Sequence, residues 1–178
     1  FRNYDPLEME GIVLVEDGKL IMSTNAAFPP YEMTDDNGDY IGIDVEIAEA
    51  IAKELGLELE INNMGFTAAL EAAQQGKADM VMAGVTVNED RLAVMDFSDS
   101  YATGIQVVIV KEGSDVTMDN LGEKMIGTQM GTTGYIYASD TPENGGYGED
   151  HQKDTTMEEK RSAARGDAIP LEKGFHRF

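Results

Sequence analysis

Among the side chains that could do chemistry, Arg91 stands out, because basic residues are scarce in this chain and Arg91 follows the loop Gly84–Thr86. A guanidinium can hold a carboxylate through two parallel hydrogen bonds. The loop separates an apolar run from a short helical pattern, and free N–H groups at a helix start also favour an anion. Arg91 is therefore a candidate for binding a carboxylate or phosphate, although spacing alone favours an exposed arginine in a surface salt bridge.

A second loop of this kind, Gln129–Thr133, also lies between a strand pattern and a helix pattern. Ligands of open α/β sheets bind beyond the carboxyl ends of the strands, so both loops are candidate ligand contacts. Phe28 and Phe66 each follow a strand pattern too, and as a pair they could enclose a ligand side chain. From spacing alone, a role as core anchors is favoured for both aromatic residues.

Composition excludes several kinds of chemistry. The chain has no Cys, which excludes disulfides, thiolate metal sites and a cysteine nucleophile. Its 2 His residues, His151 and His176, lie near the C-terminus, so histidine catalysis in the main body is excluded as well. The acidic turn Asp35–Asp39 does not fit a calcium loop, because a loop with its glycine at Gly38 would begin at Met33. No glycine-rich nucleotide motif occurs, and we expect neither a metal nor a cofactor.

The chain of 178 residues is strongly acidic, with 13 Lys and Arg against 34 Asp and Glu and a net charge of −21. This charge argues against a nucleic acid or an anionic membrane surface as partner. The acidic excess ends near residue 150, and the nearly neutral segment 151–178 also loses the strand and helix rhythm. No apolar run approaches the roughly 20 residues that span a bilayer. Residues 1–11 lack the apolar core of a signal peptide, so we expect any signal to be absent from this sequence.

Strand patterns alternate with helix patterns along the body of the chain, which predicts an α/β architecture. Strands are expected at 19–24, 57–61, 80–83, 105–110 and 125–128. The first helix should begin with Asp44 as N-cap and end before Gly56. Its buried face should carry Ala48, Ile51, Ala52 and Leu55. Two more helices are expected, one capped by Thr67 and ending at Gly76, and a short one capped by Asn88.

Taken together, these segments resemble the extracellular amino-acid-binding proteins of ABC importers, solute-binding protein family 3. The resemblance runs from about Gly18 to Gly134 and is strong in the order and spacing of its motifs rather than in any one of them. It rests on the segments Thr24–Glu32, Asn37–Val45, Gly76–Thr86, Arg91 with Val94–Ser98, and Gly127–Thr133. The fold that it implies is a type II periplasmic-binding-protein-like α/β fold, with the first lobe largely present and the second lobe incomplete.

The resemblance also implies roles for individual residues. Residues matching Arg91 and Thr86 bind the α-carboxylate of the amino acid, and the residue matching Gly84 offers its carbonyl to the α-ammonium. Aromatic residues matching Phe28 and Phe66 flank the ligand side chain. Three further expected contacts are Asn25 from the first lobe, and Gln129 and Thr133 from the second.

We expect residues 1–10 to be an N-terminal extension, 11–106 the first lobe, 107–150 the start of the second lobe, and 151–178 a divergent tail. The resemblance fades after about Asp140, and the acidic residue with which the family holds the ligand ammonium has no clear match; Asp167 is not assigned that role. An incomplete lobe exposes sheet edges and apolar surface, which predicts association with another copy of the chain.

The predicted function is that of an extracytoplasmic receptor, periplasmic or anchored at the cell surface, that captures a polar amino acid between two lobes and delivers it to an ABC permease. One alternative is an amino-acid-sensing domain of a receptor or channel, which would use the same module. A dehydratase on the same fold is the other, but the body offers no histidine, cysteine or spaced carboxylate pair for acid–base work. The chain is therefore not expected to be an enzyme.

Overall fold

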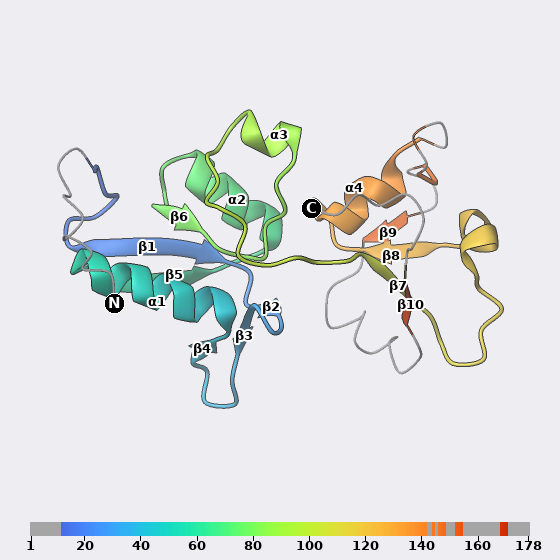
Figure 1. Cartoon of the computed structure of the whole chain (residues 1–178), viewed down its shortest axis with the longest axis horizontal. Helices are drawn as coiled ribbons and strands as arrows, with labels where there is room; N and C mark the ends of the chain where they lie inside the picture. The colour runs from blue at the N-terminus through green and yellow to red at the C-terminus, as the bar shows by residue number, and fades with distance from the viewer. Residues whose placement is uncertain (1–11, 142–143, 145, 149–151, 155–167, 171–178) are drawn as a thin grey trace. The chain divides into compact units, whose positions relative to one another are not determined.

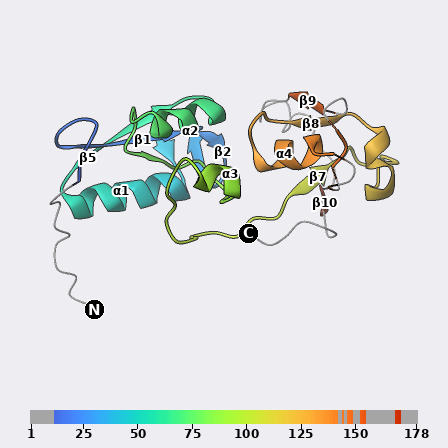
Figure 2. The same ribbon diagram turned by 90° about the horizontal axis from the view of Figure 1, so that it is seen from above.

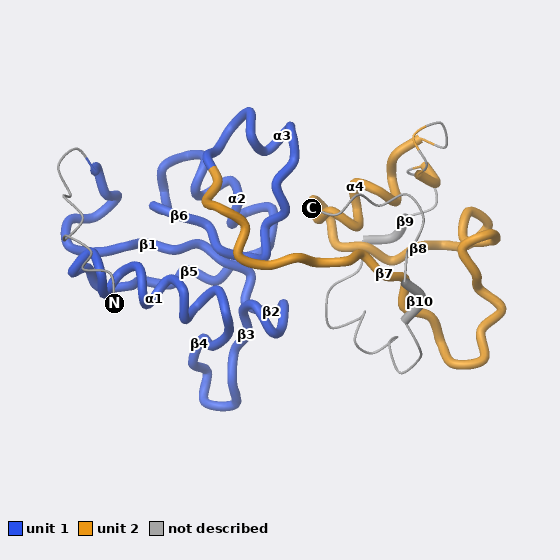
Figure 3. Tube along the Cα trace, in the orientation of Figure 1, with its two compact units in different colours: residues 1–96 blue, residues 97–178 orange. Residues whose placement is uncertain are grey.

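A computed structural model of the chain describes residues 12–141, 144, 146–148, 152–154 and 168–170. The chain forms two compact units, one running up to Asp96 and the other starting at Phe97 (Figures 1 and 3). The lobe boundaries expected from the sequence stay predictions. In the described part of the chain, no helix has the length and apolar character needed to cross a membrane.

The first unit is built on a parallel sheet of three strands. These are β1 (Lys19–Thr24), β5 (Glu58–Asn63) and β6 (Met80–Val81), in the order β5-β1-β6. Helix α1 (Ile43–Leu55) connects β1 to β5, and α2 (Phe66–Gln74) connects β5 to β6. The first strand thus lies in the middle, and the chain turns to one side after β1 and to the other side after β5. Such a reversal of strand order marks the end of an α/β sheet where ligands bind.

Side chains along β1 point alternately to the two faces of this sheet, and their contacts show which helix covers each face. Ile21 packs with Ala72 of α2, whereas the next residue, Met22, packs with Ala48 of α1. Successive side chains of a strand point to opposite faces, so the two helices lie on opposite sides of the sheet (Figures 1 and 2). Because both faces are covered, β1 is buried from Leu20 to Thr24, which includes its apolar run Leu20–Met22.

An antiparallel sheet stands between β1 and α1 in the chain. It contains β2 (Ala27–Phe28), β3 (Glu32–Thr34) and β4 (Tyr40–Ile41), in which Phe28 pairs with Glu32. After β6, the loop at Gly84 leads to the short helix α3 (Glu89–Leu92).

Several sequence predictions are confirmed. The strand at 19–24 has the predicted bounds, and the other four expected strands occur with ends shifted by one or two residues. Gly56 ends α1 in the left-handed conformation, with φ 69°. The side chain of Asn88 caps α3 by accepting the Arg91 N–H at 2.8 Å.

The predicted N-cap of α1 is wrong. Helix α1 begins at Ile43, after Gly42, and Asp44 lies inside its first turn. The reason is tertiary, because the N–H groups of Ile43 and Asp44 donate to the carbonyls of Pro30 and Tyr31, at 3.1 and 2.9 Å. The loop before β3 therefore satisfies donors that a side-chain cap would otherwise take.

Two further helix predictions are corrected. Ile51 is 38% exposed, because α1 buries Val45, Ala48 and Ala52 and leaves Ile51 at the flank of its apolar face. Helix α2 begins at Phe66 with Gly65 as N-cap, one residue before Thr67. Packing decides this start, since Phe66 is buried in the same cluster as Leu70 and Ala83.

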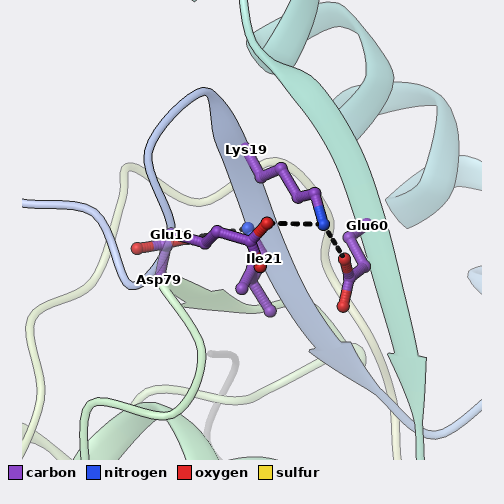
Figure 4. A network of polar contacts seen from close by, with 5 residues as sticks. All are labelled: Glu16, Lys19, Ile21, Glu60 and Asp79. Carbon is purple, nitrogen blue, oxygen red and sulfur yellow. Dashed lines mark hydrogen bonds and ion pairs between the residues drawn. The ribbon is translucent and has the colours of Figure 1, made fainter.

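Polar contacts hold the start of β1 in place, and Figure 4 shows those of Lys19 and Ile21. The two oxygens of Asp79 accept the N–H groups of Val15 and Ile21, at 2.8 and 2.7 Å, and so tie the segment before β1 to the start of β6. Lys19 forms ion pairs with Glu16 at 2.7 Å and Glu60 at 3.1 Å. Both acidic partners raise the pKa of the partly exposed Lys19 above its usual value, the contact with Glu16 contributing most.

The second unit contains two small strand pairs. β7 (Val107–Ile109) pairs antiparallel with β10 (Ala168–Pro170), and β8 (Ile126–Thr128) pairs in parallel with β9 (Gln152–Asp154). A 3₁₀ helix, η1 (Met118–Glu123), precedes β8. Helix α4 (Thr133–Ser139) follows β8, with Thr132 as its N-cap. This unit therefore also joins strands through a helix, as the sequence predicts.

Gly42→Ala should lower the free energy of unfolding by about 2 kcal/mol or more. Gly42 has φ 127° and ψ 176°, a region that L-residues avoid at a cost of roughly 1–3 kcal/mol. An added Cβ would also collide with the carbonyl oxygen of Tyr31 and lie 2.9 Å from that of Pro30. Urea unfolding followed by circular dichroism measures the loss. Gly104→Ala is the matched control, because open space surrounds Gly104; equal stability of the two variants would contradict the expected clash.

Candidate ligand-binding site

The candidate site in the first unit forms where β1, β5 and β6 end. Asn25 follows β1, Phe66 follows β5, and Gly84 follows β6. Hydrogen bonds hold these strand ends together: the Asn25 amide Nδ2 donates to the Met64 carbonyl at 2.9 Å, and the Ala26 N–H donates to Asn63 Oδ1 at 2.9 Å. Parallel strands present their carboxyl ends at one edge, so residues far apart in sequence meet here.

Arg91 is a buried side chain with only 7% of its surface exposed, which contradicts the alternative of an exposed surface arginine. Its Nη1 donates to the carbonyl of Thr86 at 2.7 Å, and its guanidinium carbon lies 5.5 Å from the centre of the Phe66 ring. Burial lowers the pKa of Arg91 from its usual value, yet a guanidinium remains protonated in proteins. The structure thus brings together Arg91, Thr86 and Phe66 around a desolvated positive charge.

A buried guanidinium of this kind is suited to a carboxylate ligand. Its planar fork presents several N–H donors in one direction, and low local polarity strengthens a charge-assisted hydrogen bond. The aromatic face of Phe66 and the Thr86 carbonyl hold the group in place, so less side-chain freedom is lost when an anion arrives.

The two phenylalanines differ in their surroundings. Phe66 is buried in a cluster with Leu70 and Ala83, as the core-anchor alternative expects, and one side of its ring faces Arg91. Phe28 is 37% exposed and stacks on Tyr31, with ring centres 5.2 Å apart and planes inclined by 14°. A ligand-flanking role for both residues stays a prediction, with Phe28 the more accessible of the two.

Gly84 lies in close contact with Phe28. A Cβ added at Gly84 would lie 2.8 Å from Phe28 Cε1, and Gly84 has φ 54°, so both space and conformation favour glycine. The Gly84 N–H donates to Asp44 Oδ2 at 2.9 Å. This contact fixes the loop that carries the carbonyl expected to meet a ligand ammonium.

Gln129 and Thr133 belong to the second unit. The Gln129 carbonyl accepts from Thr132 Oγ1 at 2.7 Å and from the Thr132 N–H at 3.2 Å, which forms the turn that starts α4 at Thr133. Both residues are half-buried. Their roles as ligand contacts stay predictions.

The sequence analysis did not identify two buried acidic residues as parts of this site. Glu32 of β3 and Asp44 of α1 are both completely buried. Burial, followed by the neighbouring Asp44 carboxyl, raises the pKa of Glu32 to about 10. Glu32 directly follows the Pro30–Tyr31 turn, and no local pattern marks it as buried; only the packing of β3 against α1 shows it.

Comparisons with known proteins agree with this arrangement. Residues 20–172 match the family described as bacterial extracellular solute-binding proteins, family 3, and so the match extends past the point where the resemblance seemed to fade. The arginine-binding extracellular protein ArtP of Bacillus subtilis is 31% identical over 86% of this chain and 61% of its own. A probable histidine-binding protein of Neisseria gonorrhoeae is 37% identical over 64% of this chain and 43% of its own.

Solved structures give the same result. An ancestral arginine-binding protein bound to arginine superposes with a TM-score of 0.74 at 34% identity, covering 86% of this chain and 70% of that one. The substrate-binding protein of an amino acid ABC transporter reaches 0.75 at 37% identity, with the same coverage. These matches confirm the predicted periplasmic-binding-protein-like α/β fold. The chain spans about three fifths or less of the two curated relatives named above.

Glu32 should make stability depend on pH. Its pKa is raised from 4.5 to about 10 in the folded chain, so the folded state keeps a proton that the unfolded state has lost between these values. The free energy of unfolding should therefore fall as pH rises from about 5 to about 10, by at most about 1.4 kcal/mol per pH unit.

The measurement is urea unfolding at several pH values for the wild type and Glu32→Gln. The difference between the two isolates Glu32 from the other carboxyl groups, because they are common to both proteins. Parallel pH profiles of the two proteins would contradict a buried, protonated Glu32.

Proposed function

The chain belongs to the bacterial extracellular solute-binding proteins, family 3, and we propose that it captures a polar amino acid outside the cytoplasm for delivery to an ABC permease. The observation that carries this proposal is the buried Arg91 guanidinium, held by the Thr86 carbonyl and the Phe66 ring. It supplies the cationic clamp that an α-carboxylate needs.

The remaining contacts are proposed from the resemblance to the family. The Gly84 carbonyl is proposed to accept from the α-ammonium, while Phe28 borders the ligand side chain and Asn25 offers it a polar contact. Gln129 and Thr133 are proposed as further contacts from the second unit. The names of the relatives, which bind arginine, histidine or cystine, support a polar amino acid as the ligand class.

We propose no catalytic step. The relatives named above are binding proteins rather than enzymes. The cationic clamp and its carbonyl and aromatic neighbours suit reversible capture of a zwitterion.

A panel of the twenty amino acids should contain one or a few that stabilise the chain. A ligand at a hundred times its Kd adds about 2.7 kcal/mol to the free energy of unfolding. For a chain of this size that corresponds to a rise in Tm of about 5–10 °C. Differential scanning fluorimetry measures it, and Arg91→Ala should abolish the rise because it removes the carboxylate clamp.

The control is Lys77→Ala, which removes an exposed positive charge from the same unit. The control should keep the full shift. A shift that survives in Arg91→Ala, or none with any amino acid for the wild type, would contradict the proposed function.

The chain is also proposed to associate with itself. In the second unit Ile105, Val107, Ile109 and Met125 are each more than 40% exposed, an accumulation of apolar surface that favours contact with another copy. Sedimentation velocity at increasing concentration should show a growing fraction of dimer or larger species. A single monomeric species over the whole range would contradict it.

A further inference from the structure

The turn between β3 and β4 contains an Asn-Gly pair, Asn37–Gly38, which the proposed function does not use. Asparagine followed by glycine is the dipeptide most prone to spontaneous deamidation, because glycine has no Cβ to keep its backbone nitrogen away from the asparagine side chain. Both residues are exposed, so water reaches them. The turn is therefore a candidate site of covalent modification.

The reaction requires that two groups of the turn be free to move. The Gly38 nitrogen loses its proton and attacks Asn37 Cγ, the bond from Cγ to Nδ2 breaks, and Nδ2 leaves as ammonia after taking up a proton through water. A molecule of water then opens the five-membered succinimide at one of its two carbonyl carbons. One opening gives aspartate, and the other gives isoaspartate, in which the main chain runs through the side-chain carbon and is one bond longer.

Asp35 holds both of the reacting groups. The Gly38 N–H donates to the Asp35 carbonyl at 3.1 Å, and the Asn37 amide Nδ2 donates to Asp35 Oδ2 at 3.2 Å. A hydrogen-bonded N–H gives up its proton less readily, and a side-chain amide that is bound to a carboxylate is less free to turn toward an attacking nitrogen. The closed turn therefore opposes the first step of deamidation.

Further contacts fix Asp35 in this position. Its Oδ1 accepts the N–H groups of Asn37 at 2.8 Å and Asp39 at 2.9 Å, and the Asp35 N–H donates to the Asp39 carbonyl at 2.9 Å. Thr34 and Tyr40 pair directly outside the turn. The Asp39 N–H, more than any other contact, lowers the pKa of the Asp35 carboxyl, so this group is ionised at neutral pH. One charged side chain thus organises the whole turn.

We propose that Asn37 is a site of spontaneous deamidation and that Asp35 sets its rate: the closed turn keeps Asn37–Gly38 intact, and each opening of the turn allows the succinimide to form. The product carries a new negative charge next to Asp35 and Asp36, and isoaspartate also lengthens the connection between β3 and β4. The modification thus works against the turn that had delayed it. This inference concerns the turn alone and does not depend on ligand binding.

The test compares deamidation rates in the full chain. Wild type, Asp35→Ala and Asp36→Ala are incubated at pH 8 and 37 °C, and mass-spectrometric peptide mapping follows the conversion of amide to acid at residue 37. Asp35→Ala should react at least about five-fold faster, because hydrogen bonds to a charged acceptor are the strong ones. Asp36→Ala should stay within about two-fold of the wild type, since it removes an equal, screened charge but none of the contacts described above.

Two further measurements complete the comparison. Circular dichroism spectra and Tm values that match the wild type would show that Asp35→Ala is folded, so that a faster reaction reports the turn alone. Wild type unfolded in urea should deamidate at Asn37 faster than the folded wild type. Equal rates in the folded wild type and Asp35→Ala would overturn the role of Asp35, as would an equal acceleration in Asp36→Ala. A wild-type rate that is the same folded and unfolded would overturn the protection by the turn.

Discussion

The hydrogen bond from the Gly84 N–H to the buried Asp44 carboxylate is the contact on which the first unit's candidate site depends. It joins the end of β6 to the beginning of α1, two segments that are forty residues apart in sequence. A buried carboxylate is costly unless charge-assisted hydrogen bonds replace its hydration, so this contact has to persist in the folded chain. Phe28 packs closely on the same glycine.

The site combines this buried acid with a buried guanidinium. Arg91 lies on α3, whose N-cap is Asn88, and its guanidinium donates to the Thr86 carbonyl. Screening by salt weakens distant surface charges, whereas a desolvated guanidinium acts at contact. The overall charge of −21 is therefore compatible with binding an anionic carboxylate group.

The sheet topology explains why these residues can meet at all. In the order β5-β1-β6, the crossover through α1 leads from β1 to β5 on one side, and the crossover through α2 leads from β5 past β1 to β6 on the other side, so the loops after β1 and β6 diverge at the same edge. Asn25 comes directly after β1, and Phe66 and Gly84 come a few residues after the ends of β5 and β6.

The sequence by itself determined the strand and helix alternation, the family, and the positions of Arg91, Thr86 and Gly84 as candidates, because local periodicity and ordered motifs carry that information. It also identified Gly56 as the residue that ends α1 and Asn88 as the N-cap of α3, since helix ends depend on nearby residues. Tertiary structure alone decided that Arg91 is buried, that Ile51 is exposed, and that Asp44 holds Gly84 instead of capping α1. It alone buried Glu32 and Asp44 completely, because burial depends on contacts between segments that are distant in sequence, to which no local pattern is sensitive.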